Sequence, residues 1–244
     1  MDFEGKVAVV TGGGTGIGGA TSLALAKRGA IVAVNYSKSA QDAEQTVKQI
    51  VSAGGRAIAI QADVSSDDDV NAMMKQVVDA FGRLDLLVNN ASITRHIPLQ
   101  DLDAVSDDAW NELFAVNVKG MFHCARAAAR VMSEGAAIVN LGSIAGTTGI
   151  GSSLPYAVSK AAVHGLTKSL ARALAPKVRV NCIVPGAVAT RWWAGREEQM
   201  QRLAPQLLLQ RIATAEDVAE AIVSALGLEG MTGQMITVDS GQTL

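Results

Sequence analysis

The sequence predicts an α/β fold in which a single, doubly wound sheet of about seven parallel strands carries helices on both faces. Two observations lead to this prediction. Short runs rich in β-branched residues alternate with longer helical patterns along the whole chain, and such alternation is typical of a parallel sheet of the Rossmann type. The strand runs are also continuously apolar, which indicates a sheet that is covered on both faces.

The individual elements follow from the same patterns. Apolar runs predict strands at residues 6–11, 31–35, 56–62, 85–90, 137–141, 178–184 and 235–238. Helical patterns lie between them, at residues 18–28, up to residue 51, and at 67–81, 107–132, 155–174 and 215–226. The first three helices are followed by Gly29, Gly54 and Gly82, and glycine readily takes the left-handed conformation that ends a helix. No linker, repeat or low-complexity tract interrupts this order, so residues 1–244 are expected to form one domain.

Composition excludes several classes of protein. The 244 residues are 49% hydrophobic and carry a net charge of −2, which rules out a disordered chain. The charges form no long run, so neither nucleic acid nor a membrane is an expected partner. No apolar run approaches the roughly 20 residues of a membrane span, and the N-terminus lacks the pattern of a signal peptide. With two cysteines, and no cluster of His, Cys and acidic residues, we expect a soluble, cytoplasmic protein without a metal site.

A glycine-rich turn at residues 11–18 follows the first strand pattern and precedes the first helix. Glycine permits a positive φ and a close approach of the backbone to a ligand. The helix that follows offers its N–H groups and its positive end to phosphates. This placement predicts a dinucleotide site rather than a purely structural turn. The expected contacts come from Gly12, Thr15, Gly16, Ile17 and Gly18.

The end of the second strand bears on which dinucleotide binds. An acidic residue there holds the ribose hydroxyls of NAD and would repel a 2′-phosphate, but this chain has Tyr36. Ser37 and Lys38 follow and suit a phosphate, so NADP(H) is the preferred cofactor and NAD(H) the alternative. Thr15 is not the basic residue that often assists from the glycine turn. The other interpretation of Lys38 is a solvated loop lysine.

Three residues suggest acid–base chemistry. Tyr156 and Lys160 are four apart in a helical pattern, so they share one face of the helix. A free phenol has a pKa near 10, and a nearby ammonium favours the phenolate and lowers that value. Ser143 follows a strand, at the sheet edge where ligands of such folds bind. Its hydroxyl is placed to hydrogen-bond a substrate oxygen.

Several motifs occur together in a family-like order. They are Thr11-Gly12-x-x-x-Gly16-Ile17-Gly18, Asp63-Val64, Asn89-Asn90-Ala91, Asn117, Ser143, Tyr156-x-x-x-Lys160 and Pro185-Gly186. This set closely resembles the short-chain dehydrogenase/reductase family. The resemblance spans the whole chain, and its general look is closest to the 3-oxoacyl carrier-protein reductases.

The resemblance implies a role for each matching residue. Tyr156 would exchange a proton with the substrate oxygen, Lys160 would lower its pKa and hold the nicotinamide ribose, and Ser143 would orient the substrate. Asn117 would hold a water that links Lys160 to a proton relay. Adenine would contact Asp63 and Val64, and the ribose side of the cofactor would be lined by Asn89 and Ala91. The nicotinamide half would be flanked by Pro185, Gly186, Val188 and Thr190. One departure from the family is Ser92, where glycine is usual.

The substrate side is less defined. The resemblance implies a lid over the substrate at about residues 187–210. This segment contains Trp192 and Trp193, which would either wall a hydrophobic pocket or pack at a subunit contact. His96 either points into the pocket or is a solvated loop histidine. The resemblance also implies that the helices at 107–132 and 155–174 pair across a twofold axis, within a homotetramer.

Three functions remain open at this stage. The first is an NADP(H)-preferring oxidoreductase that interconverts a ketone, or a 3-oxoacyl group, and a secondary alcohol. The second is an NAD-dependent dehydrogenase that oxidises a polyol, sugar or hydroxysteroid. The third is a non-catalytic sensor of NADP(H), which is disfavoured because Tyr156 and Lys160 are both present. A small free ketone or alcohol is at least as suitable a substrate as an acyl chain on a carrier protein.

Overall fold

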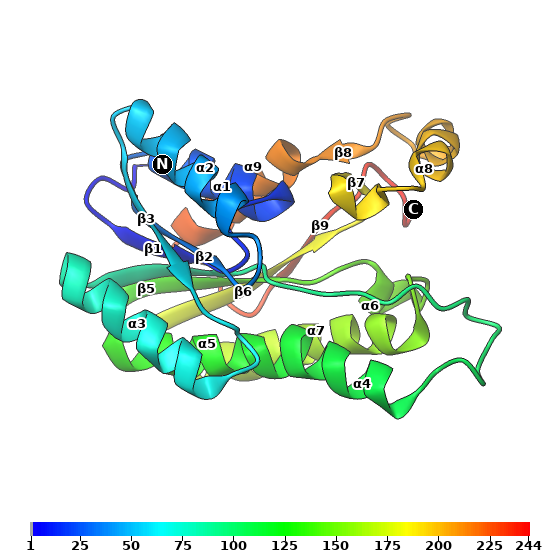
Figure 1. The fold of residues 1–244 in the computed structure, drawn as a ribbon, viewed down its shortest axis with the longest axis horizontal. Coiled ribbons are helices and arrows are strands. Elements are labelled where there is room, and N and C mark those ends of the chain that lie inside the picture. Colours follow the sequence, from blue (N-terminus) through cyan, green and yellow to red (C-terminus); the bar gives the residue numbers. More distant parts are fainter. Residues whose placement is uncertain (1) are drawn as a thin grey trace.

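The central feature is a sheet of seven parallel strands in the order β3-β2-β1-β4-β5-β6-β9 (Figure 1). The computed structural model describes residues 2–244. The strands are β1 Val7–Val10, β2 Ile31–Tyr36, β3 Arg56–Gln61, β4 Leu84–Asn89, β5 Met132–Leu141, β6 Val178–Pro185 and β9 Met235–Val238. Each predicted strand is present, and the predicted fold class, a doubly wound Rossmann sheet, is confirmed.

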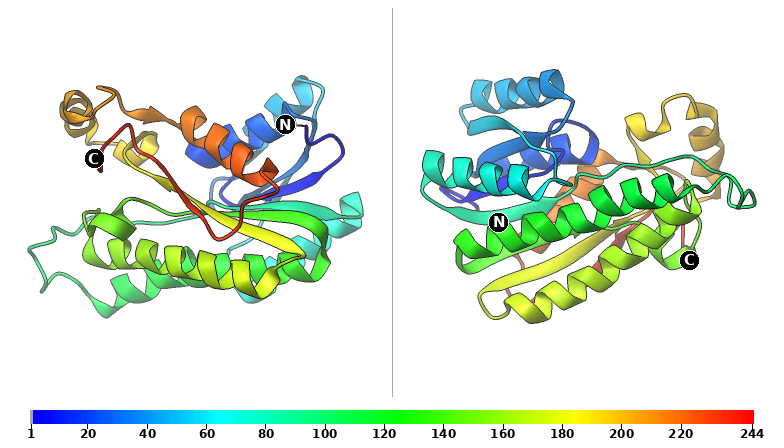
Figure 2. Two further views of the ribbon diagram at one scale, coloured as in Figure 1. Left: turned by 180° about the vertical axis from the view of Figure 1, so that it is seen from behind. Right: turned by 60° about the horizontal axis from the view of Figure 1, so that its bottom comes forward.

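Helices cover both faces of this sheet, as the two views of Figure 2 also show. One face carries α1 Gly16–Ala26, α2 Ala40–Ser52 and α9 Ala215–Gly227. The other carries α3 Asp67–Phe81, α4 Asp107–Phe114, α5 Met121–Val131 and α7 Leu154–Leu174. Strand β1 shows how the core is divided, because Val7 and Val9 pack toward the second group while Ala8 and Val10 pack toward the first. Alternate side chains of a strand point to opposite faces, so a strand buried on both sides must be apolar throughout.

Two helices differ from their predicted bounds. Helix α1 begins at Gly16, two residues earlier than expected, because the glycine turn itself winds into the first helical turn. The long helix expected at 107–132 is interrupted by a π-helical segment, Ala115–Gly120, between α4 and α5. Strand β5 then begins at Met132, where a helix end was expected. Wider turns of this kind occur often at functional sites, and this one contains Asn117.

The remaining elements lie outside the central sheet and its large flanking helices. The short helix α6 spans Ala145–Thr148, and α8 spans Glu197–Leu203. Strands β7 Val188–Ala189 and β8 Ala213–Thr214 pair in parallel as a second, two-stranded sheet. Their pairing joins the two ends of the segment that contains Trp192 and α8. Across residues 2–244, no helix is long and apolar enough to cross a membrane.

Candidate active site

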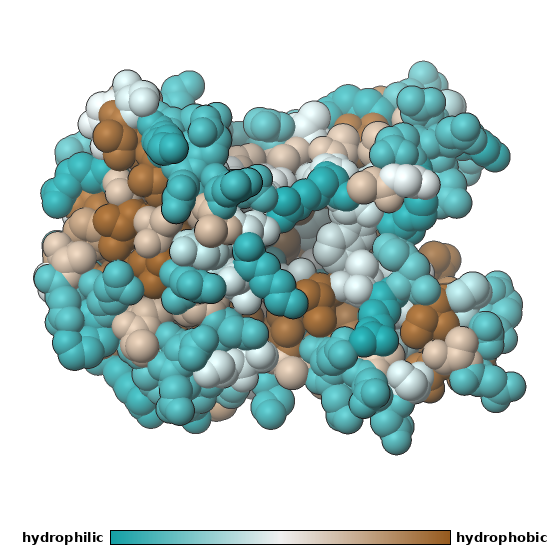
Figure 3. Space-filling view, in the orientation of Figure 1, coloured by the Kyte–Doolittle hydropathy of each residue, from teal (hydrophilic) through white to brown (hydrophobic). Residues whose placement is uncertain are grey.

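The main cavity lies along the carboxyl ends of the parallel strands and has a volume of about 920 Å³. In Figure 3 this face of the molecule is hollowed between the part that carries α8 and the part that carries α4. Most of the residues predicted for the site line it: Gly12, Thr15, Gly16, Ile17, Tyr36, Ser37, Lys38, Asp63, Val64, Ala91, Ser143, Tyr156, Lys160, Pro185, Gly186, Val188 and Thr190. Gly18, Asn89 and Asn117 do not line it.

The glycine turn forms one wall of the main cavity. Gly12 and Gly16 have φ values of 60° and 53°, a region that favours glycine. The side chain of Thr15 does not cap the first turn of α1. The N-terminal end of α1 therefore offers its partial positive charge to an anion. Gly18 has a different part: a Cβ there would lie 2.1 Å from the carbonyl oxygen of Gly12. Its role is to let the helix pack against the turn.

Asn90, rather than Asn89, serves the glycine turn. The Asn90 side chain donates hydrogen bonds to the backbone oxygens of Thr11 and Gly12, and Asn90 lines the main cavity. Asn89 is the last residue of β4 and is buried in the sheet, where it donates to Asn140 Oδ1 over 2.9 Å. The expectation that Asn89 lines the cofactor side thus differs from the structure. Neighbouring residues on a strand face opposite ways, so a shift of one position moves the side chain to the other layer.

The end of β2 forms a second wall. Tyr36, Ser37 and Lys38 line the main cavity, and Lys38 is exposed there. Helix α2 begins immediately afterwards without a side-chain cap. Arg191 reaches this region from the opposite side and lies 2.8 Å from Asp42. Sequence reasoning missed Arg191, because its partner is 149 residues away along the chain.

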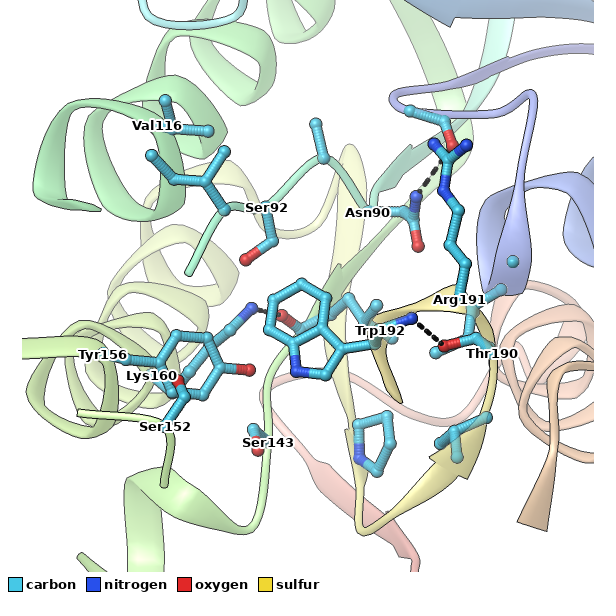
Figure 4. A pocket seen from close by; sticks show the side chains of 18 of the residues that line it. Asn90, Ser92, Val116, Ser143, Ser152, Tyr156, Lys160, Thr190, Arg191 and Trp192 are labelled. Atoms are coloured by element: carbon cyan, nitrogen blue, oxygen red, sulfur yellow. Dashed lines mark hydrogen bonds between the residues drawn. The ribbon is translucent and has the colours of Figure 1, made fainter. Parts of the chain in front are cut away.

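The third wall brings Tyr156, Lys160 and Ser143 together (Figure 4). Ser153 caps the N-terminus of helix α7, and its hydroxyl accepts a hydrogen bond from the backbone N–H of Tyr156. One turn later Lys160 is buried, with its Nζ 5.8 Å from the centre of the Tyr156 ring. The same Nζ donates to the carbonyl oxygen of Leu141 over 2.9 Å. Ser143 follows β5 and lies beside the phenol.

Burial governs the protonation of this group. It raises the pKa of Tyr156 to about 12, and the neighbouring Ser143 hydroxyl partly offsets that rise. Burial also lowers the pKa of Lys160 to about 8. The sequence led us to expect that Lys160 lowers the pKa of Tyr156. Here the removal of water around the phenol has the larger effect, because desolvation disfavours its charged form.

Asn117 lies in the π-helical segment and is fully buried. Its side-chain oxygen accepts hydrogen bonds from the Ser92 hydroxyl and the backbone of Ile93, and its nitrogen donates to Ser159. Ser92, the departure from the family pattern, thus fastens the loop after β4 to this segment. Ser159 lies next to Lys160, so Asn117 connects two walls of the main cavity without lining it.

The fourth wall comes from the segment between β7 and β8. The Trp192 ring lies 5.8 Å from that of Tyr156, and both Trp192 and Trp193 line the main cavity. The guanidinium of Arg196 lies 5.4 Å from the Trp193 ring and donates to His96 Nε2 over 3.0 Å. Sequence analysis did not single out Arg196. His96 lines the main cavity and is also exposed, so the structure agrees with both interpretations of that residue.

Comparison with known proteins decides the family. The family model described as Enoyl-(Acyl carrier protein) reductase matches residues 12–243. The 3-oxoacyl-acyl-carrier-protein reductase FabG of Staphylococcus aureus is 39% identical, with 97% of each chain covered. The short-chain dehydrogenase/reductase homolog YusR of Bacillus subtilis is 65% identical over 129 residues, which are 52% of this chain and all of YusR. A short-chain dehydrogenase from Burkholderia cenocepacia, solved in complex with NADP, is 39% identical, covers 100% of both chains and has a TM-score of 0.92. The chain belongs to the short-chain dehydrogenase/reductase family.

This short-chain dehydrogenase/reductase is an oxidoreductase that acts on CH–OH or C=O groups with a nicotinamide dinucleotide. The main cavity fits such a cofactor on its own evidence. Its lining includes both Lys38 and Tyr156, and it also includes the uncapped end of α1, which would receive the phosphates. A Cβ at Gly12 would lie 3.1 Å from Asn90 Nδ2, and one at Gly16 would lie 3.6 Å from the Thr190 side chain, so a side chain at either position would contact residues that line the cavity.

Proposed function

We propose that this short-chain dehydrogenase/reductase is an NADP(H)-preferring enzyme that interconverts a ketone, or a 3-oxoacyl group, and a secondary alcohol. The observation that supports the proposal most is the grouping of Tyr156, Lys160 and Ser143 at one end of the main cavity. A hydroxyl donor, a proton donor and a buried ammonium together suit a carbonyl oxygen that gains negative charge. The cofactor, when bound, supplies or accepts the hydride.

Each polar residue at this end of the main cavity has its own role in the proposed reaction. The Ser143 hydroxyl hydrogen-bonds the substrate oxygen and holds it beside Tyr156. In reduction, Tyr156 donates its proton to that oxygen, and in oxidation it takes the proton back. Lys160 stabilises the phenolate that reduction leaves behind and binds the nicotinamide ribose. Asn117 positions Lys160 through Ser159 and the π-helical segment.

The preference for NADP(H) rests on the end of β2. Residue 36 is a tyrosine, so the acidic residue that would repel a 2′-phosphate is absent from this position. Within the described residues 2–244, Lys38 forms no ion pair. The uncapped N-terminus of α2 adds a partial positive charge beside it. The remaining cofactor contacts that we propose come from Gly12, Thr15, Gly16, Ile17, Ser37, Asp63, Val64, Ala91, Pro185, Gly186, Val188 and Thr190.

The substrate lies under a lid formed by about residues 187–210 of the single domain 1–244. A small free ketone or alcohol fits this arrangement, and the FabG relative makes a 3-oxoacyl group the leading alternative. We also propose that the enzyme is a homotetramer, since Phe122 and Val131 on α5 and Val158 on α7 expose apolar side chains. Sedimentation tests this, because a species of a single chain's mass at micromolar concentration would contradict it.

The experiment that tests the activity compares NADPH and NADH oxidation against a panel of ketones and 3-oxoacyl thioesters. We expect turnover with NADPH well above that with NADH. Faster turnover with NADH, or alcohol oxidation with NAD alone, would replace the proposal by the NAD-dependent alternative. Tight NADPH binding with no turnover, in the wild type and in Tyr156→Phe alike, would instead indicate the sensor.

A further inference from the structure

Arg196 is the feature of the main cavity that the proposed function does not use. It stands at the substrate end, on the segment just before α8, and is half-buried. Its side chain packs on the Trp193 ring and donates to His96 Nε2 and to the Trp192 carbonyl oxygen, each over 3.0 Å. The Trp192 ring in turn lies against Tyr156. One residue, Trp192, therefore separates Arg196 from the proposed proton donor.

The charge of Arg196 has no carboxylate partner within residues 2–244. Two other charged side chains that line the main cavity, Glu112 and Arg191, are paired with Arg95 and Asp42. The acid next in sequence, Glu197, turns away and accepts a hydrogen bond from the backbone of Gly195. The two hydrogen-bond acceptors of Arg196 are both neutral, so its positive charge at the main cavity is uncompensated.

The guanidinium is also held in place. Both of its hydrogen bonds use Nη2, which leaves the N–H groups of Nε and Nη1 without a partner in the described part of the chain. A nitrogen that accepts from an arginine must be unprotonated, and burial together with Arg196 lowers the pKa of His96 accordingly. An arginine that is held in place and has free N–H groups on Nε and Nη1 is well suited to bidentate binding of an oxyanion.

The lining of the main cavity includes apolar side chains, among them Val116, Ile150 and Leu203, and two tryptophans, Trp192 and Trp193, contact Arg196 directly. An isolated cation in such a wall selects for a substrate that carries one negative group at a fixed distance from the reacting carbon. We propose that Arg196 binds an anionic oxygen group of the substrate, a carboxylate or a phosphate, and that the substrates are oxo acids and hydroxy acids or phosphate-bearing thioesters. This inference rests on the proposed function, since it places the carbonyl oxygen at Tyr156.

The test compares substrates that share the reacting carbonyl and either carry or lack the anionic group. Acetoacetate and ethyl acetoacetate form the carboxylate pair; acetoacetyl-coenzyme A and the N-acetylcysteamine thioester form the phosphate pair. Each is measured with NADPH on the wild type, Arg196→Gln, Arg196→Lys and Arg202→Gln. Arg202 is the matched control, since it lies on α8, pairs with Glu198 and does not line the main cavity.

We expect Arg196→Gln to lower kcat/KM for the anionic member of one pair by at least ~tenfold, the loss of a charged hydrogen bond. The neutral member should change by less than about twofold, Arg196→Lys should restore part of the loss, and Arg202→Gln should have no effect. The pair that responds identifies the anion as carboxylate or phosphate. An equal loss on both members of each pair, or no loss on either, would overturn the proposal.

A separate readout keeps the two proposals distinguishable. If the wild type does not turn over any of the four ketones, the proposed function fails. Calorimetric binding of acetoacetate and of acetoacetyl-coenzyme A to the NADP-saturated wild type, Arg196→Gln and Arg202→Gln then decides the role of Arg196. Binding that only Arg196→Gln weakens supports the anion site. Equal affinity in all three proteins, or no binding to any of them, contradicts it.

Discussion

The two halves of the main cavity are built in different ways. The cofactor half rests on strand ends and backbone: the turn after β1, the end of β2 and the loop after β4. The substrate half rests on side chains that meet across loops, chiefly Trp192 on Tyr156 and Arg196 on His96. Backbone geometry fixed by a parallel sheet has little freedom to change, whereas contacts between loop side chains change with single substitutions. The first half therefore serves a common cofactor, and the second can be specific to one substrate.

Removing the proposed proton donor should have the largest effect, because Tyr156 lies where the two halves of the main cavity meet. Tyr156→Phe keeps the ring that packs on Trp192 but lacks the hydroxyl. We expect kcat to fall by roughly 10²–10⁴-fold, while the Kd for NADPH changes little. Stopped-flow turnover and fluorescence titration check the two expectations. A variant with more than a tenth of the wild-type kcat would show that another group supplies the proton.

Crowding the backbone of the cofactor half should lower both the stability of the protein and its affinity for NADPH. In Gly18→Ala, the new Cβ would lie 2.1 Å from the Gly12 oxygen and 2.5 Å from Asn90 Nδ2. We expect this crowding to cost about 1–3 kcal/mol, to lower Tm by several degrees and to weaken NADPH binding more than tenfold. Gly230→Ala, in the turn after α9, is the control, because a Cβ there meets nothing within 4 Å. An unchanged Tm and Kd in Gly18→Ala would contradict this view of the turn.

Reduction and oxidation should depend on pH in opposite ways. Lys160 has its pKa lowered to about 8, so it loses its charge above that pH and no longer stabilises the phenolate left by reduction. We therefore expect kcat/KM for reduction to fall above pH 8. Oxidation needs the Tyr156 phenolate, whose pKa of about 12 makes that form rarer toward low pH, so its rate should rise with pH. Parallel profiles for the two directions would count against these assignments.

The smallest expected effect concerns selection between cofactors. Lys38→Gln removes one exposed cation from the cofactor half. The Kd for NADPH should rise about tenfold, as for the loss of one charged contact, and that for NADH by less than twofold. Lys48→Gln, also on the exposed surface but outside the main cavity, serves as the control. Equal effects on the two cofactors would make Lys38 a solvated loop residue.

Most of the cofactor half could be predicted from the sequence, and most of the substrate half could not. Strand runs, the glycine turn and the four-residue spacing of Tyr156 and Lys160 are local patterns with direct structural meaning. The error at Asn89 has a local cause too, since residues next to each other at a strand end face opposite layers. Arg196 was missed for a different reason: its partner His96 lies 100 residues away, and no local pattern signals that meeting.

The pairing of β7 with β8 makes the proposed lid a segment that can be exchanged as one unit. Val188 and Ala189 pair with Ala213 and Thr214, so residues 190–212 form a loop whose two ends are held together by the protein itself. The entropy of closing such a loop grows only with the logarithm of its length, about 0.6 kcal/mol for each doubling. Insertions, deletions or a transplanted lid should therefore leave the sheet and the glycine turn intact. Evolution can therefore change this part of the substrate half by exchanging a single segment of the chain.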